Sequence, residues 1–274
     1  MARPPRADIA APELPPRVRW LGPEPGAMAE LTAAGPVLVH FFDFAQLNSV
    51  RSVPYVEAWH ERYAGAGLSV LGVHSPRFPF TATAQALAAG IERLGITYPV
   101  AQDSSYAIWH DYGAKGWPSL FLWNSPGALA WFHFGEGEYR ATEEAIQEEL
   151  RSLDAMAELP APLDPLRPSD AHGAMVVPPS EELFPGGGPG EPWQPDGTSD
   201  VLDIPYAAGG AYAAAAGEGG LYFALDEGPE RLVGVTGPGL YELVEHPSHE
   251  SHRLELRASD GVDLYAISFA AGVP

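Results

Sequence analysis

Cysteine is missing from all 274 residues of the sequence. Without a sulfhydryl group these residues supply no disulfide bond, no thiolate metal ligand and no thiol-based redox chemistry. Basic residues are also scarce, since 15 Lys plus Arg stand against 36 Asp plus Glu, for a net charge of −21. Nucleic-acid binding relies on clustered Lys and Arg, and an acidic surface is repelled by anionic lipid. We therefore expect neither a nucleic-acid partner nor a membrane partner.

Long apolar segments are missing too. No run approaches the roughly 18 consecutive apolar residues of a membrane span, and residues 1–16 lack the apolar stretch of a secretory signal. We therefore expect a cytoplasmic protein. Hydrophobic residues make up 46% of the chain and charged residues 19%, which is typical of a folded protein. The length allows two domains of ordinary size.

The clearest local pattern lies in residues 36–57. The apolar and β-branched run of residues 37–42 predicts a buried strand. Apolar residues then recur at a spacing of three from Leu47 to Val56, which predicts a helix, and Pro54 should kink it. A buried strand, a short turn and a helix N-terminus form the geometry of many α/β active sites.

These residues resemble the strand, motif and helix of the thioredoxin fold, specifically those of the TlpA/DipZ-like thiol–disulfide oxidoreductases. In that family the turn carries Cys-x-x-Cys, and the helix has a proline five residues after the second cysteine. Pro54 stands five residues after Ser49, so the motif window here is Gln46, Leu47, Asn48 and Ser49. The scaffold is similar, whereas an amide and a hydroxyl occupy the two cysteine positions.

Two further segments carry the resemblance. Trp117-Pro118, just before a predicted strand, is similar to the family's cis-proline peptide, which faces the motif turn and offers its backbone to an extended peptide. Residues 135–139 resemble a family loop near that proline, and Thr142 is the expected cap of a final helix over residues 143–156. The resemblance implies a β-α-β-α-β-β-α order. The residues expected on the binding face are Asp43, Phe44, Gln46, Asn48, Ser49, Trp117, Pro118 and Glu136.

Composition divides the chain into four segments. Residues 1–35 are a proline-rich, irregular extension, residues 36–156 form the thioredoxin-like domain, and residues 157–192 form a linker rich in Pro and Gly. Residues 193–274 show short alternating runs separated by turns, which predict an all-β sandwich. The end of this segment resembles the jelly-roll-like C-terminal domain of DipZ-like proteins, which is similar to carbohydrate-binding modules. The predicted fold class is an α/β thioredoxin fold followed by a jelly-roll-like, all-β sandwich.

The C-terminal segment contains two candidate binding features. His246, His249 and His252 have the most metal-like spacing in the chain, since three imidazoles could converge on zinc or nickel. Pro247 and the position between two strands instead predict a solvated hairpin loop, so we expect no metal and no other cofactor. Aromatic side chains could stack on sugar rings, although alternating aromatics in a sandwich usually belong to its core. These aromatics are Trp193, Tyr206, Tyr212, Tyr222, Tyr241 and Tyr265.

The leading functional prediction is a redox-inactive, thioredoxin-like protein that holds a protein or peptide partner on the former active face. Ser49 would need an adjacent base to act as a nucleophile, and no histidine lies in the turn, so no catalytic residue is assigned. Two alternatives stay open. One is a non-thiol enzyme, metal- or serine-dependent, that uses His74, Asp43 or the three histidines. The other is a protein that binds carbohydrate through its C-terminal domain.

Overall fold

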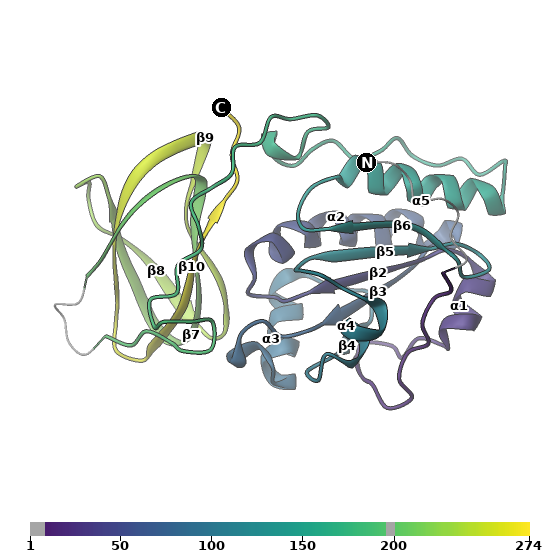
Figure 1. Cartoon of the computed structure of the whole chain (residues 1–274), viewed down its shortest axis with the longest axis horizontal. Helices are drawn as coiled ribbons and strands as arrows, with labels where there is room; N and C mark the ends of the chain where they lie inside the picture. Colours follow the sequence, from purple (N-terminus) through teal and green to yellow (C-terminus); the bar gives the residue numbers. More distant parts are fainter. Residues whose placement is uncertain (1–8, 196–200) are drawn as a thin grey trace. The chain divides into compact units, whose positions relative to one another are not determined.

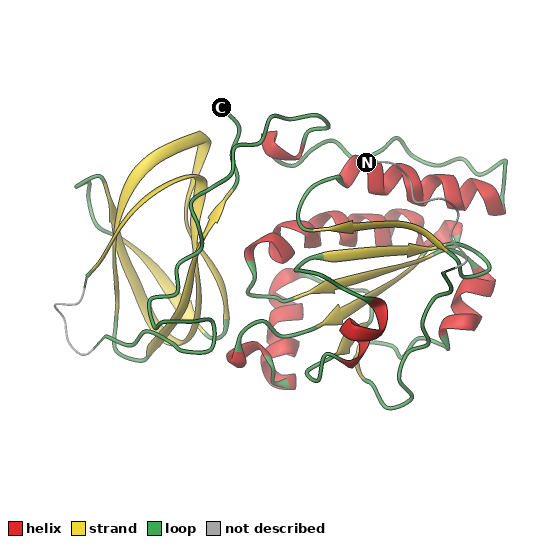
Figure 2. Ribbon diagram, in the orientation of Figure 1, coloured by secondary structure: helices red, strands yellow, loops and turns green. Residues whose placement is uncertain are grey.

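Figure 1 and Figure 2 show the computed structural model of the chain, which describes residues 9–195 and 201–274. Residues 1–8 of the expected N-terminal extension and residues 196–200 of the expected sandwich lie outside the described residues. The chain divides into two compact units. The first contains the residues up to Asp43, Asn48–Pro76 and Thr83–Pro165, and the second contains Phe44–Leu47, Arg77–Ala82 and Leu166–Pro274.

Within the described ranges, no helix is both long and apolar enough to cross a membrane.

The first unit is built on a six-stranded sheet in the order β1-β4-β3-β2-β5-β6. Its strands are β1 (Arg19–Leu21), β2 (Val37–Phe42), β3 (Ser69–His74), β4 (Val100–Gln102), β5 (Ser119–Trp123) and β6 (Leu129–Phe134). The strands β2, β3 and β4 are mutually parallel, whereas β1, β5 and β6 run antiparallel to their neighbours. Every residue of β2 is buried, because a central strand has both of its faces covered.

The first unit also contains α-helices, which lie between strands or, in the case of the last one, after β6. They are α1 (Met28–Ala34), α2 (Leu47–Tyr63), α3 (Ala84–Leu94), α4 (Ala107–Tyr112) and α5 (Tyr139–Leu153). Pro54 lies inside α2 on its exposed side, where water can bond to the carbonyl that loses its N–H partner. From β2 onward the order of elements is that of the thioredoxin fold, so the fold predicted for this part of the chain is confirmed.

Two parts of the first unit differ from prediction. Residues 1–35, predicted to be irregular, include α1. The carboxylate of Glu13 accepts hydrogen bonds from the first N–H groups of this helix, those of Met28 and Ala29, at 3.1 and 3.2 Å. The last helix begins at Tyr139, and the predicted cap Thr142 lies buried within it. Its hydroxyl oxygen accepts a hydrogen bond from Nε1 of Trp131 at 3.2 Å.

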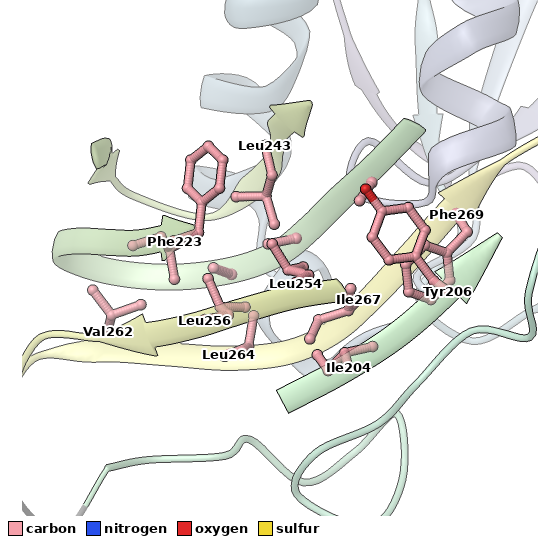
Figure 3. Packing of buried hydrophobic residues seen from close by; sticks show 14 of the residues in the cluster. Ile204, Tyr206, Phe223, Leu243, Leu254, Leu256, Val262, Leu264, Ile267 and Phe269 are labelled. Carbon is pink, nitrogen blue, oxygen red and sulfur yellow. The ribbon is translucent and has the colours of Figure 1, made fainter. Parts of the chain in front are cut away.

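The C-terminal region of the second unit is an all-antiparallel β domain, as predicted. Its strands are β7 (Leu202–Leu225), β8 (Arg231–Thr236), β9 (Gly239–Ala258) and β10 (Val262–Ala270), all paired in antiparallel fashion. The middle of β7 pairs with β10 and with the first half of β9, whereas both ends of β7 pair with the second half of β9. The strands β7 and β9 therefore pair with each other in separate stretches. Figure 3 shows the apolar cluster of this domain, which includes Ile204, Phe223, Leu254, Leu256, Leu264 and Ile267.

Residues 246–252, predicted to form a hairpin loop, lie within β9. Ala208 pairs with Glu250 and Gly210 pairs with Glu245, so β9 has three extra residues opposite Gly209. A side chain at Gly209 would bring its Cβ within 2.8 Å of the carbonyl oxygen of Ala271, so this close approach requires glycine. A long-range pairing, and not a local turn, therefore shapes this stretch.

Candidate functional site

Four strands of the first unit meet at one edge of its sheet. In the register of the sheet, His74 pairs with Phe42 on one side and with Gln102 on the other. The strand β5 runs antiparallel to β2 and pairs Ser119 with Phe41, so the start of β5 lies beside the end of β2. The residues that stand directly beyond these strand ends are Asp43, Ser75, Asp103 and Pro118.

Asp103 organises this edge. Its carboxylate accepts hydrogen bonds from the N–H groups of Ile108 and Trp109 at 3.1 and 2.9 Å, at the start of α4. It also accepts a hydrogen bond from the hydroxyl of Ser75 at 3.0 Å. The backbone oxygen of Ser75 in turn accepts a hydrogen bond from Nε1 of Trp117 at 2.7 Å. One nearly buried carboxylate thus links the ends of β3 and β4 to the segment before β5.

Ser49 stands where the related family has its second cysteine. Its side-chain oxygen accepts a hydrogen bond from the backbone N–H of Asp43 at 3.3 Å, and the hydroxyl of Ser52 donates to its backbone oxygen at 2.7 Å. Ser49 and Asp43 are completely buried. The hydroxyl therefore joins the end of β2 to the first turn of α2, which is a structural contact and not a nucleophile exposed to substrate.

Asp43 and His74 approach each other at the same edge. Oδ2 of Asp43 lies 3.9 Å from Nε2 of His74, and both side chains are completely buried. Burial lowers the pKa of His74, and the nearby charge of Asp43 opposes this effect only in part. His74 is therefore neutral near pH 7. Neither side chain is therefore exposed to solvent.

The loop after β6 contacts both the segment before β5 and the helix α2. The N–H of Gly135 donates to the backbone oxygen of Pro118 at 2.8 Å. The side chain of Glu136 accepts a hydrogen bond of 2.5 Å from Nε of Arg51 on α2, with exposed fractions of 17% and 7%. The peptide bonds Trp117–Pro118 and Ser125–Pro126 are both cis.

The indole of Trp117 is half-buried and anchored. Besides its hydrogen bond to Ser75, its ring lies 4.5 Å from the ring of Trp109, measured between centroids, and 6.5 Å from the ring of Tyr106. All three aromatic residues are half-buried. They form a partly exposed aromatic surface whose side chains are already held in place.

The remaining predicted face residues are distributed between the two units. Phe44, Gln46 and Leu47 belong to the second unit and are buried, and Leu47 packs there with Tyr212 and Ala270. Asn48 is half-buried in the first unit. The edge of the sheet thus gathers Asp43, Ser49, Trp117, Pro118 and Glu136 from the predicted set.

Three residues at this edge, namely Arg51, Ser75 and Asp103, were not predicted from the sequence. Asp103 carried a usable signal, since an acidic residue shortly before a helix often satisfies its first N–H groups. Arg51 carried none, because its partner Glu136 is 85 residues away in the chain.

In the C-terminal unit only two of the three candidate histidines lie in one cluster of possible metal ligands. His246 and His252 lie together with Glu250, and ligand atoms of these three residues are all within 4.8 Å of one another. Burial, followed by the nearby charge of His252, lowers the pKa of His246. Among the six aromatic candidates for sugar stacking, Tyr206, Tyr212 and Tyr265 are buried, which is typical of core residues.

No family model matches the chain. Protein DipZ of Mycobacterium bovis is 27% identical over 269 residues, which cover 85% of this chain and 38% of that protein. NHL repeat-containing protein 2 of Bos taurus is 28% identical over 132 residues, which cover 47% of this chain and 18% of that protein. A solved thiol-disulfide isomerase from Corynebacterium glutamicum has 24% sequence identity and a TM-score of 0.44, and the match covers 51% of this chain and 96% of the other.

The chain spans 38% of the length of the mycobacterial relative. The match to DipZ covers so much of this chain that it includes parts of both units. The order and pairing of the strands in the first unit independently define the fold. The chain is a thioredoxin-like protein without cysteine that carries a second, all-β domain and is similar to DipZ over 85% of its length.

Proposed function

We propose that this chain is a redox-inactive, thioredoxin-like protein that binds an extended segment of a partner protein beside Trp117 and Pro118. The observation that carries the proposal is the anchored, half-buried aromatic surface of Trp117, Trp109 and Tyr106. Tryptophan and tyrosine dominate binding energies at protein interfaces, and a side chain that is already fixed loses little entropy on binding. The net charge of −21 favours a partner segment that is basic or uncharged.

The redox-inactive part of the proposal rests on the chemistry of the turn. Gln46 and Ser49 cannot form a mixed disulfide, and Ser49 is buried and engaged by the N–H of Asp43. A non-thiol enzyme that uses Asp43, Ser49 or His74 has less support, because these three side chains are buried. A carbohydrate-binding role also has less support, since half of its candidate aromatics are buried.

The binding proposal predicts a large effect at Trp117. Peptides selected from a library of short, unstructured sequences against the full chain should bind at least about tenfold more weakly after Trp117→Ala, because the substitution removes the anchored aromatic contact. Isothermal titration calorimetry measures the change. Met156→Ala is the matched control, since Met156 is an apolar residue that is 85% exposed beyond the end of α5. Equal affinities of the wild type and Trp117→Ala would place the binding surface elsewhere.

A second prediction concerns the turn that contains Gln46 and Ser49. We expect the double variant Gln46→Cys plus Ser49→Cys to form an intramolecular disulfide in air, because residues three apart at a helix start are within bridging range. Mass spectrometry detects the loss of two hydrogens. Gln46→Cys plus Ser52→Cys is the control, since six residues of helix separate Cα atoms by about 9 Å, too far for a disulfide. A double variant that keeps both thiols reduced would contradict a thioredoxin-like turn.

The wild-type chain should not accelerate the reduction of insulin, because it has no thiol.

A further inference from the structure

A second cluster of reactive side chains lies on β9 and is not used by the proposed binding function. Alternate residues of a strand share one face, and Glu250 and His252 share the face of the buried Leu254 and Leu256. The bulge in β9 brings His246 back onto this face, where its ring stacks on that of His252 with centroids 4.1 Å apart. Polar groups on an inward face are costly unless they are paired or bind an ion.

His252 is held between two carboxylates. Its Nδ1 lies 2.6 Å from Oδ2 of Asp226, and its Nε2 lies 3.2 Å from Oε2 of Glu250. Asp226 is fixed in turn, because its Oδ1 accepts a hydrogen bond from the N–H of Arg253 at 2.8 Å. A carboxylate that accepts from one ring nitrogen directs the lone pair of the other nitrogen and raises its basicity, as it does in many metal sites.

His246 is oriented by a buried tyrosine. The hydroxyl of Tyr206 lies 2.8 Å from Nε2 of His246. The ring of Tyr206 stacks on that of Phe269 with centroids 4.9 Å apart, at one end of the apolar cluster in Figure 3. Tyr206 also pairs directly with His252 in the register of β7 and β9. Tyr206 therefore connects His246 and His252 to one end of the sandwich core.

We propose that His246, Glu250 and His252 bind a zinc-type divalent cation and that Asp226 and Tyr206 orient the two imidazoles. Two imidazole nitrogens and one carboxylate oxygen form a ligand set that proteins use for zinc, with a fourth position left for water. Ligand atoms bound tetrahedrally at zinc distances lie about 3.3 Å apart. The separation of 3.2 Å between Nε2 of His252 and Oε2 of Glu250 fits this value. The two carboxylates also supply the two negative charges that a divalent cation balances.

Binding requires one movement. A metal ion lies in the plane of an imidazole that binds it, whereas the rings of His246 and His252 are stacked with 19° between their planes. One ring must therefore turn out of the stack when the ion binds. Both histidines are half-buried, and neither belongs to the apolar cluster.

The test uses the untagged full chain, stripped with a chelator and titrated with zinc chloride by isothermal titration calorimetry. We expect one equivalent of zinc per chain, with the affinity reduced about 100-fold or more in His252→Ala and Glu250→Gln, since even orienting partners contribute 10- to 100-fold. Asp226→Asn should reduce the affinity about tenfold or more. Bound cobalt should give the strong visible absorption of a tetrahedral site.

His249→Ala is the matched control, because His249 lies in the same stretch but outside the cluster. Its affinity for zinc should equal that of the wild type. The absence of stoichiometric zinc binding by the wild-type chain would overturn the proposal, and so would an equal loss in His249→Ala and His252→Ala. Glu250→Gln keeps the size and shape of the side chain, so it decides the question even if His252→Ala does not fold. Near-ultraviolet circular dichroism confirms that each variant is folded.

Discussion

Replacing Asp103 by alanine is expected to lower the free energy of unfolding by about 3 kcal/mol. The carboxylate serves three donors at once, namely the N–H groups of Ile108 and Trp109 and the hydroxyl of Ser75. Alanine leaves these donors without their acceptor at a buried position, and each unsatisfied donor costs free energy. Urea denaturation at pH 7.5, followed by circular dichroism, measures the change.

Two variants sharpen this measurement. Asp103→Asn keeps one acceptor oxygen, so we expect it to recover part of the loss. Ser104→Ala changes the exposed neighbour and should alter stability by less than about 0.5 kcal/mol. If Asp103→Ala were as stable as Ser104→Ala, the carboxylate would not organise this edge of the sheet. The same variant should also weaken peptide binding, because Asp103 holds Ser75 and through it Trp117.

Acidification is expected to destabilise the chain well above the pH at which carboxylates are protonated. Burial lowers the pKa of His40 from 6.5 to about 3, and its ring nitrogens contact Ser52 and Tyr98 at 3.1 and 3.2 Å. In the unfolded chain the imidazole of His40 takes up a proton at about pH 6.5, whereas in the folded chain it stays neutral at this pH. Above pH 6.5 this difference does not reduce the free energy of unfolding. Below pH 6.5 the free energy of unfolding falls by about 1.4 kcal/mol per pH unit, which amounts to about 2 kcal/mol at pH 5.

The stability difference between pH 7.5 and pH 5, from urea denaturation, tests this expectation. The lowered pKa of buried His74 acts in the same direction. His40→Asn should be less stable overall but should lose about 2 kcal/mol less on acidification. His110→Gln is the control, since His110 on α4 is exposed in the folded state. An unchanged pH dependence in His40→Asn would show that this histidine accepts a proton in the folded chain.

Much of the fold could be predicted because its signals are local. The buried run of β2, the spacing of apolar residues in α2 and the proline inside that helix each depend on neighbours in the chain. The helix α1 could not be predicted in the same way. Its first N–H groups are satisfied by Glu13, a residue outside the helix whose position depends on the tertiary fold.

The candidate site was only partly predictable for the same reason. The motif window and Trp117-Pro118 were found from sequence, but Arg51, Ser75 and Asp103 gain their roles from partners brought together by the sheet. In the second unit His246, His249 and His252 have a metal-like spacing, but the sequence predicted a solvated hairpin loop without a metal. The bulge in β9 instead places Glu250 beside His246 and His252.

By itself the sequence determined which chemistry these residues lack, because a chain without cysteine has no thiol to oxidise. It also determined the class of both domains, since the motif segments resemble those of the thioredoxin fold and the alternating runs after residue 193 predict an all-β domain. Only the tertiary structure decided which polar groups meet. Hydrogen bonds such as that from Ser75 to Asp103, and clusters such as His246 with His252, depend on strand register. The buried face of each strand constrains its register, but the partner strand here is distant in the chain, so the neighbours of a polar residue in the sequence do not reveal its partner.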